Sequence, residues 1–159
     1  MENIENRKLK SPHRKSVHHI LAHSYTFYFL LFIMGFFLDI IFPIKIFESV
    51  LVRYFGVLVV LFATFLIFWA QRTSRNLDKS NLTKESFQKG PYNFTRGPTH
   101  LGLFLLIIGF GFVANTIFVI FFTVVAFFIT KLVFLKEQEM LLEERYGDPY
   151  REYKKSVRF

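Results

Sequence analysis

The sequence predicts an all-α integral membrane protein with about four membrane helices and a C-terminal amphipathic helical tail. Of its 159 residues, 52% are hydrophobic and 23 are phenylalanine, yet the net charge is +8. Three long apolar blocks, 24–42, 54–70 and 101–130, alternate with charged segments. Such segregation is typical of membrane proteins, which keep their charges in loops. The length fits a single domain over 1–159.

The first two blocks each predict one membrane span, because about 20 apolar residues cross a bilayer as a helix. Block 54–70 carries no charge and ends at the only tryptophan, Trp69. Block 24–42 is interrupted by Asp39. An acid inside an apolar span is a functional candidate by default. Asp39 lies near the end of its span, however, where it can instead reach interfacial water or Lys45.

The third block, 101–130, is too long for one span. As a single helix its 30 residues would extend about 45 Å at about 1.5 Å per residue, whereas the hydrocarbon core is only about 30 Å thick. Asn115 lies near the middle and favours a turn. We therefore expect a helical hairpin, with a short arm over 99–113 and a second arm from 116 to about 136.

The basic residues predict the orientation. Segments 1–23, 71–100 and 131–159 hold five, six and seven Lys or Arg residues, and only Lys45 and Arg53 lie elsewhere. Cytoplasmic segments are enriched in these residues, and four crossings put all three segments on one side. Three crossings would send the basic tail outward. We expect both termini in the cytoplasm, with the protein in the cell inner membrane.

Composition also limits which kinds of functional site and partner are possible. The chain has no cysteine, which excludes disulfides, thiolate catalysis and cysteine metal ligands. His19 and His23 can share a helical face, but no carboxylate pattern accompanies them, so we expect no metal site. The basic residues flank spans and form no continuous patch. We expect membrane lipids as partners, no nucleic acid and no obligate protein partner.

Residues 90–102 form a polar segment in which two glycine–proline pairs predict turns. The second pair comes directly before a helix, where Thr99 is placed as the cap. Free N–H groups at that helix start favour an anion, and Arg96 adds a permanent charge with a bidentate donor fork. His100 falls in the first turn. A purely structural reading stays open, in which Arg96 reaches lipid phosphate and Gly102 only lets helices approach.

The tail over 137–159 predicts two helices. Glutamates interleave with apolar residues at helical spacing, and Gly147 is expected to end that helix as a left-handed cap. Asp148 and Pro149 are then the N-cap and first residue of the next helix. Glu139 either pairs with the basic loop or faces the polar segment, where it can bind a cation or ribose hydroxyls. Three tyrosines can share one helical face: Tyr146, Tyr150 and Tyr153.

These two motifs resemble those of the isoprenylcysteine carboxyl methyltransferase and phospholipid methyltransferase superfamily, over about residues 50–159. The first family signature is roughly GxYxxxRHPxYxG before a membrane hairpin, and the matching residues here are Gly90, Tyr92, Arg96, Pro98 and Gly102. The second is roughly EExxLxxxFGxxYxxY after the hairpin, and the matching residues are Glu139, Leu142, Gly147, Tyr150 and Tyr153, with Tyr146 in place of the phenylalanine.

The chain departs from these signatures at three positions. Gly97 stands where the family has histidine, His100 where it has tyrosine, and Gln138 where it has the first glutamate of a pair. His100 lies only three residues beyond Gly97. Its imidazole is therefore a candidate to take over the lost contact.

The resemblance implies methyl transfer from S-adenosylmethionine to a lipid-like or isoprenoid acceptor at the cytoplasmic membrane face. Such a transfer needs an aligned acceptor and a site that excludes water, but no protein nucleophile or metal. The resemblance implies catalytic roles for Arg96, His100 and Glu139. It implies cofactor binding by Gly90, Tyr92, Arg96, Pro98, His100, Gly102 and Glu139.

Two other functions stay open. A nicotinamide-dependent membrane reductase relative would carry similar signatures in its C-terminal part. A non-enzymatic membrane scaffold would keep the family fold, and the departures at Gly97 and Gln138 suit it. The acceptor is also open among a phospholipid amine, a prenyl carboxylate and a quinone-like compound.

Overall fold

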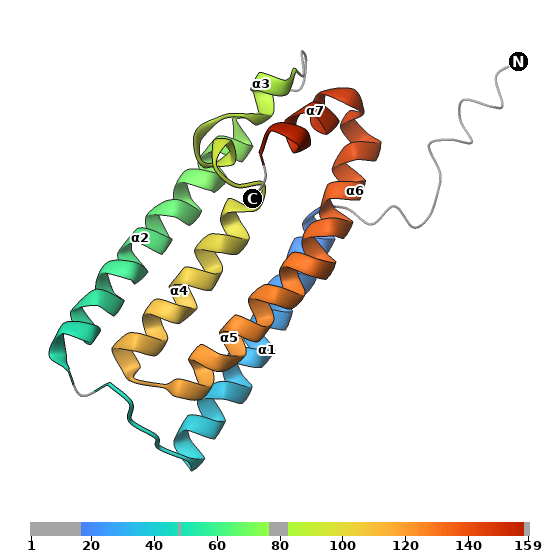
Figure 1. Ribbon diagram of the computed structural model, residues 1–159. Coiled ribbons are helices and arrows are strands. Elements are labelled where there is room, and N and C mark those ends of the chain that lie inside the picture. Colours follow the sequence, from blue (N-terminus) through green and yellow to red (C-terminus); the bar gives the residue numbers. More distant parts are fainter. Residues whose placement is uncertain (1–16, 48, 77–82, 158–159) are drawn as a thin grey trace, which may run out of the picture.

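The computed structural model describes residues 17–47, 49–76 and 83–157, and every regular element within them is helical (Figure 1). Most of the expected basic N-terminal segment lies outside the described residues. The elements in chain order are α1 (Val17–Ile41), α2 (Val50–Arg75), α3 (Lys84–Phe87), the 3₁₀ turn η1 (Gly90–Asn93), α4 (Pro98–Ala114), α5 (Ile117–Ile129), the π-helical turn η2 (Thr130–Phe134), α6 (Leu135–Tyr146) and α7 (Asp148–Ser156).

Three of the described helical stretches are long and apolar enough to cross a membrane: His19–Ile41, Val50–Arg75 and Ile117–Tyr146. The last is one continuous helix made of α5, η2 and α6. Helix α4 is also apolar but shorter, with 17 residues. The predicted all-α membrane architecture is thus confirmed. The first two helices run beyond the predicted blocks because helical backbone continues into their polar flanks.

The predicted hairpin is present, and its turn is centred on Asn115. This residue has left-handed backbone angles, with φ 55° and ψ 50°, which asparagine tolerates better than most residues. Its Oδ1 accepts the backbone N–H groups of Ile46 and Phe47 at 3.2 and 3.0 Å, and its Nδ2 donates to the Phe47 carbonyl at 3.0 Å. One side chain therefore joins the hairpin turn to the loop between α1 and α2.

Asp39 caps α5. Its two carboxylate oxygens accept the backbone N–H groups of Phe118 and Val119 at 3.2 and 3.0 Å. These belong to the N–H groups that have no partner within a helix start, and a negative charge there is favourable. The helix's own N-cap, Thr116, makes no side-chain capping bond. Capping of α5 is a role for Asp39 that the sequence did not predict.

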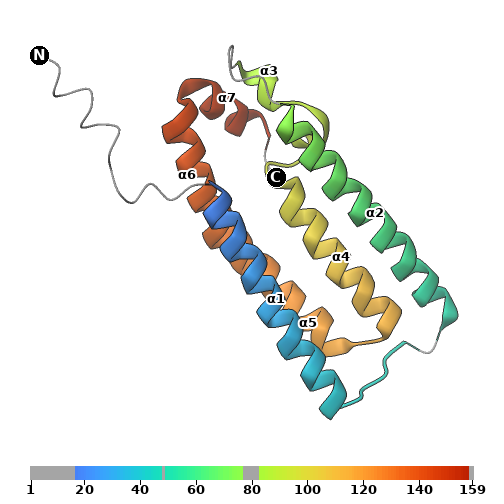
Figure 2. The same ribbon diagram turned by 180° about the vertical axis from the view of Figure 1, so that it is seen from behind.

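The long helices form one bundle in which α4 packs against α2 and α5, and α1 packs on α5 (Figures 1 and 2). Glycines allow the closest approaches. A Cβ on Gly56 would lie 2.8 Å from the Gly109 carbonyl oxygen, and one on Gly109 would lie 2.9 Å from that of Gly56. Gly35 of α1 similarly faces the Val119 backbone. Small residues at helix contacts are typical of membrane bundles.

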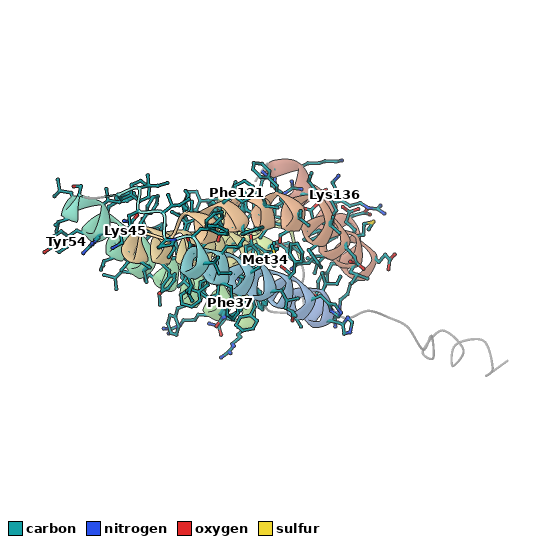
Figure 3. All side chains as sticks on the ribbon, turned by 90° about the horizontal axis from the view of Figure 1, so that it is seen from below. Met34, Phe37, Lys45, Tyr54, Phe121 and Lys136 are labelled. Atoms are coloured by element: carbon teal, nitrogen blue, oxygen red, sulfur yellow. The ribbon has the colours of Figure 1, made fainter. Side chains whose placement is uncertain are left out.

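The outside of the bundle is apolar. Phe37 and Phe121, which project outward in Figure 3, are both 59% exposed. Exposed aromatic residues continue along α2, where Phe65 is 60% exposed. So large an apolar surface would be unfavourable in water. It fits the lipid-facing surface of an integral membrane protein.

The polar segments gather at one end of the bundle. The start of α1, the segment with α3 and η1, and the tail with α6 and α7 lie at this end, whereas residues 42–47 and the turn between α4 and α5 lie at the other (Figure 1). Gly147 ends α6 with φ 64° and ψ −136°, which is not the left-handed helical cap expected. Helix α7 begins at Asp148, one residue earlier than predicted, with Pro149 second.

Candidate functional site

A cavity of about 660 Å³ lies at the polar end of the bundle. This volume is within the range of about 300–1,000 Å³ typical of small-molecule sites. Side chains from α1, α2, α3, α4, α6 and α7 line the cavity together with the loop before α4. Both predicted motifs therefore contribute to one hollow.

The predicted cofactor residues divide into two groups. Tyr92, Arg96, Pro98 and His100 line the cavity. Three others are not among its lining residues: Gly90, Gly102 and Glu139.

The two glycines are contact points with α2. Gly90 has a positive φ of 57°, and a Cβ there would lie 2.7 Å from Thr73 Oγ1. A Cβ on Gly102 would lie 2.5 Å from Ile67 Cγ1. The absence of a side chain at these two positions lets η1 and the first turns of α4 pack closely against α2.

Helix α4 begins at Pro98, with Gly97 as its N-cap. Thr99 is therefore the second helical residue and not the cap, which corrects the expectation. Proline suits the first helical position because its φ is already helical and it has no N–H to satisfy. The Thr99 side chain instead lines the cavity. Before the helix, the Gly97 N–H donates to Thr95 Oγ1 at 3.3 Å.

Arg96, Glu139 and Lys154 form a charge network beside the cavity. Arg96 Nη1 lies 3.0 Å from Glu139 Oε1, and Lys154 Nζ lies 3.1 Å from Glu139 Oε2. The Glu139 side chain is only 7% exposed. A buried carboxylate of this kind is costly unless it is paired. Glu139 thus holds the Arg96 guanidinium at the cavity wall.

Lys154 is a residue that sequence reasoning missed. Its Nζ also lies 2.6 Å from Glu143 Oε1, and this carboxylate raises the pKa of Lys154. Ion pairs that can be recognised from sequence spacing join residues three or four apart on one helix. Lys154 and Glu143 are eleven residues apart, across the turn at Gly147. No local pattern marks the pair.

His100 is 5% exposed and connects three helices. Its Nδ1 lies 3.3 Å from Ser24 Oγ of α1, and its Nε2 lies 3.2 Å from Gln138 Oε1 of α6. Because an amide oxygen can only accept, Nε2 carries the proton and Nδ1 accepts from the serine hydroxyl. His100 and Gln138, two of the residues that differ from the family signatures, therefore contact each other. Ser24 was not predicted.

An aromatic wall closes the cavity on the side of α3 and α7. Tyr153 Oη donates to the Tyr92 carbonyl at 2.8 Å. Burial raises the pKa of Tyr92, Tyr150 and Tyr153, so these phenols are neutral at physiological pH. Neutral aromatic faces attract cations. The wall comprises Phe87, Tyr92, Tyr146, Tyr150 and Tyr153.

Tyr150 and Tyr153 share a face of α7 as their spacing predicted, whereas Tyr146 is the last residue of α6. Tyr150 and Tyr153 are both 2% exposed, with ring centroids 5.6 Å apart. Phe87 of α3 lies 5.4 Å from the Tyr150 ring and 5.9 Å from the Tyr153 ring. Sequence reasoning missed Phe87 because it stands in a polar loop without a motif. Its contribution depends on α3 packing against α7.

Within residues 17–47, 49–76 and 83–157, no group of three His, Asp or Glu side chains is placed to hold a metal ion. The His19 and His23 rings lie 4.3 Å apart. His23 Nδ1 donates to the His19 carbonyl at 2.8 Å, a contact within one helix.

A family model described as phospholipid methyltransferase matches residues 51–149. The match runs from α2 to the start of α7 and includes the polar segment, the hairpin and Glu139. It leaves out α1 and most of α7. No curated protein and no solved structure matches the chain significantly.

Proposed function

The chain belongs to the phospholipid methyltransferase family, which is a family of methyltransferases, and from this premise we propose that it transfers the methyl group of S-adenosylmethionine to a lipid-like acceptor at the membrane surface. The observation that carries the proposal is the position of the cavity. It lies at the polar end of a membrane bundle and is lined by residues of both motifs. A soluble cofactor and a lipid can both reach such a place.

The lining residues fit the cofactor. When bound, S-adenosylmethionine supplies a methyl group on a positively charged sulfur. Arg96 offers a guanidinium for a carboxylate, and Thr99 and Gln138 offer neutral hydrogen-bonding groups. The aromatic wall offers neutral ring faces for a flat base or a cation. The volume of about 660 Å³ leaves room for part of an acceptor.

The chain's own residues bind and orient the reactants. Glu139, at 3.0 Å, fixes the direction of the Arg96 guanidinium. On the other side, Leu21 and Ala22 of α1 give the cavity an apolar edge suited to a hydrocarbon chain. Positioning and exclusion of water are the contributions that this transfer requires of the protein. We infer that the cavity faces the cytoplasm, because most of the basic residues that the structure describes lie in segments at its end of the bundle.

Cofactor binding tests the proposal. The purified protein in lipid nanodiscs is titrated with S-adenosylmethionine and, separately, with NADPH, and its thermal unfolding is followed. A ligand present at about 100 times its Kd stabilises a protein by about 2.7 kcal/mol. We expect stabilisation by S-adenosylmethionine alone. Stabilisation by NADPH alone would favour the reductase function, and none by either would favour the scaffold.

A second assay identifies the acceptor. The protein is incubated with S-adenosylmethionine labelled in its methyl group, in nanodiscs that contain an aminophospholipid, a prenylated carboxylate or a quinol. Label that enters the organic phase in one arm identifies the acceptor class. Binding without transfer in any arm would overturn the proposed methyl transfer to these acceptors while leaving the cofactor site in place.

A further inference from the structure

We propose that His100 is a positioning residue that ties α1 to the cavity, and that Ser24 of α1 belongs to the site through it. The proposal rests on the proposed function only in taking the cavity as the ligand site. Helix α1 supplies Leu21, Ala22 and Tyr25 to the lining. The family match begins at residue 51, so the place of α1 in the site follows from contacts alone.

The bridge is a chain of two hydrogen bonds across three helices. The Ser24 hydroxyl donates to His100 Nδ1 at 3.3 Å, and Nε2–H donates to Gln138 Oε1 at 3.2 Å. Ser24 is 0% exposed and His100 is 5% exposed. Water therefore cannot replace either partner easily, and removing one leaves the other buried and unsatisfied. Both His100 and Gln138 line the cavity.

The missing side chain at Gly97 leaves room beside the imidazole. A Cβ on Gly97 would lie 3.5 Å from His100 Cδ2 and 3.2 Å from Leu135 Cδ1. The backbone of Gly97, with φ −126°, is one that other residues also adopt. Backbone strain therefore does not require glycine at 97, and a Cβ there would be tight only against Leu135 Cδ1. A side chain at 97 would point at the space that the His100 ring and Leu135 occupy.

The bridge matters because the two ends of α1 are held differently. At the far end, Asp39 fixes α1 to α5 through two backbone N–H groups. At the cavity end, α1 packs on η2 and α6 and reaches α4 through the Ser24–His100 bond. Losing the imidazole would let the cavity edge formed by Leu21 and Tyr25 move.

The test follows the position of α1 directly. Because the chain has no cysteine, cysteines at the exposed residues Thr26 and Glu144 can carry a spin-label pair across α1 and α6. Double electron–electron resonance in nanodiscs gives the distance distribution. We expect Ser24→Ala and His100→Ala to broaden or shift the distribution. We also expect His100→Ala to weaken binding of S-adenosylmethionine about tenfold, as lost hydrogen bonds would.

Moving the imidazole from position 100 to position 97 tests whether His100 acts by hydrogen bonding or by filling space. In the double variant Gly97→His/His100→Ala the ring is attached three residues earlier, at a position whose Cβ would lie 3.5 Å from the present His100 Cδ2. We expect it to restore the narrow distribution and affinity to within about threefold of wild type, less than one hydrogen bond. The matched control Gly97→Leu/His100→Ala fills the space without a polar group. We expect it to recover thermal stability only.

The outcomes distinguish this proposal from the proposed function. Unchanged distributions in folded Ser24→Ala and His100→Ala proteins would overturn the bridge, as would equal rescue by leucine and histidine. If the wild-type protein binds no S-adenosylmethionine, the proposed function fails. The spin-label distances would still decide whether His100 positions α1.

Discussion

Glu139 carries its negative charge where water hardly reaches it, and the arrangement of charges around it shapes the site at the scale of single residues. Arg96 and Lys154 each contact one of its oxygens, at 3.0 and 3.1 Å. The carboxylate thereby offsets two cations that would otherwise repel each other beside the cavity. The guanidinium of Arg96 reaches the cavity wall in one fixed direction.

This network gives a prediction for cofactor affinity. Arg96→Ala and Glu139→Gln should each weaken S-adenosylmethionine binding about ten- to a hundredfold, because a charge-assisted contact contributes about 1.5–3 kcal/mol. Isothermal titration of the detergent-solubilised protein measures the change. Arg151→Ala is the matched control, because this arginine pairs with the exposed Asp148 and is not among the residues that line the cavity. Wild-type affinity in both test variants would mean that the cofactor lies elsewhere.

At the scale of elements, each end of the bundle is joined by side chains that come from distant helices. Asp39 of α1 caps α5, and Asn115 joins the hairpin turn to residues 42–47. At the cavity end, α7 folds back on α3 and η1 through its buried tyrosines. The hairpin and the tail are therefore stabilised by contacts with residues that lie outside these two segments.

Removing the cap on α5 should destabilise the bundle without affecting the site. Asp39→Ala should lower the free energy of unfolding by about 0.5–2 kcal/mol, the usual effect of losing an N-cap. S-adenosylmethionine affinity should stay at the wild-type value, because Asp39 lies at the opposite end from the cavity. Thr116→Ala serves as the control, since that residue makes no capping bond. Equal losses in stability for the two variants would contradict the capping role.

The tail should weaken at alkaline pH. Burial raises the pKa of Tyr150 and Tyr153 above that of an unfolded tyrosine, which is about 10. The unfolded chain therefore loses these protons first as pH rises, so stability is complete below about pH 10 and declines above it. The double variant Tyr150→Phe/Tyr153→Phe should show a smaller decline between pH 9 and 11 in denaturant titrations. A decline equal to that of wild type would assign the alkaline sensitivity to other groups.

For the whole molecule, the arrangement of helices and the distribution of charge agree. The start of α1 and the tail lie at the same end of the bundle, and residues 42–47 lie at the other (Figure 1). Most of the basic residues that the structure describes belong to segments at the first end. An even number of crossings follows if α4, with 17 residues, crosses the bilayer together with the three longer helices.

Cysteine labelling tests this orientation in intact cells. Single cysteines at Asn6 and Ser156 should resist an impermeant thiol reagent, whereas one at Ser49, in the opposite loop, should react. The absence of native cysteine means that no background needs to be removed. Labelling at Ser156 but not at Asn6 would show an odd number of crossings. The hairpin would then fail to bring the tail back to the cytoplasm.

The amino-acid sequence alone was enough for the membrane class, the hairpin turn near Asn115 and the polar motifs on either side of it. These depend on local composition, on segment length relative to the bilayer and on turn chemistry. The prediction that Tyr92, Arg96, Pro98 and His100 belong to one site, whose side chains line one cavity, came from the family resemblance. The predicted caps of α4 and α7 were wrong by two residues and one residue, because the glycine before each helix is its N-cap.

Only the tertiary structure decided which side chains face one another. Asp39 meets Val119 across 80 residues, Ser24 meets His100 across 76, and His100 meets Gln138 across 38. Each pairing depends on how a helix is rotated about its axis against its neighbour, and close contacts at glycines such as Gly35 set that rotation. Periodicity identifies the face of a helix, but packing alone determines what that face meets.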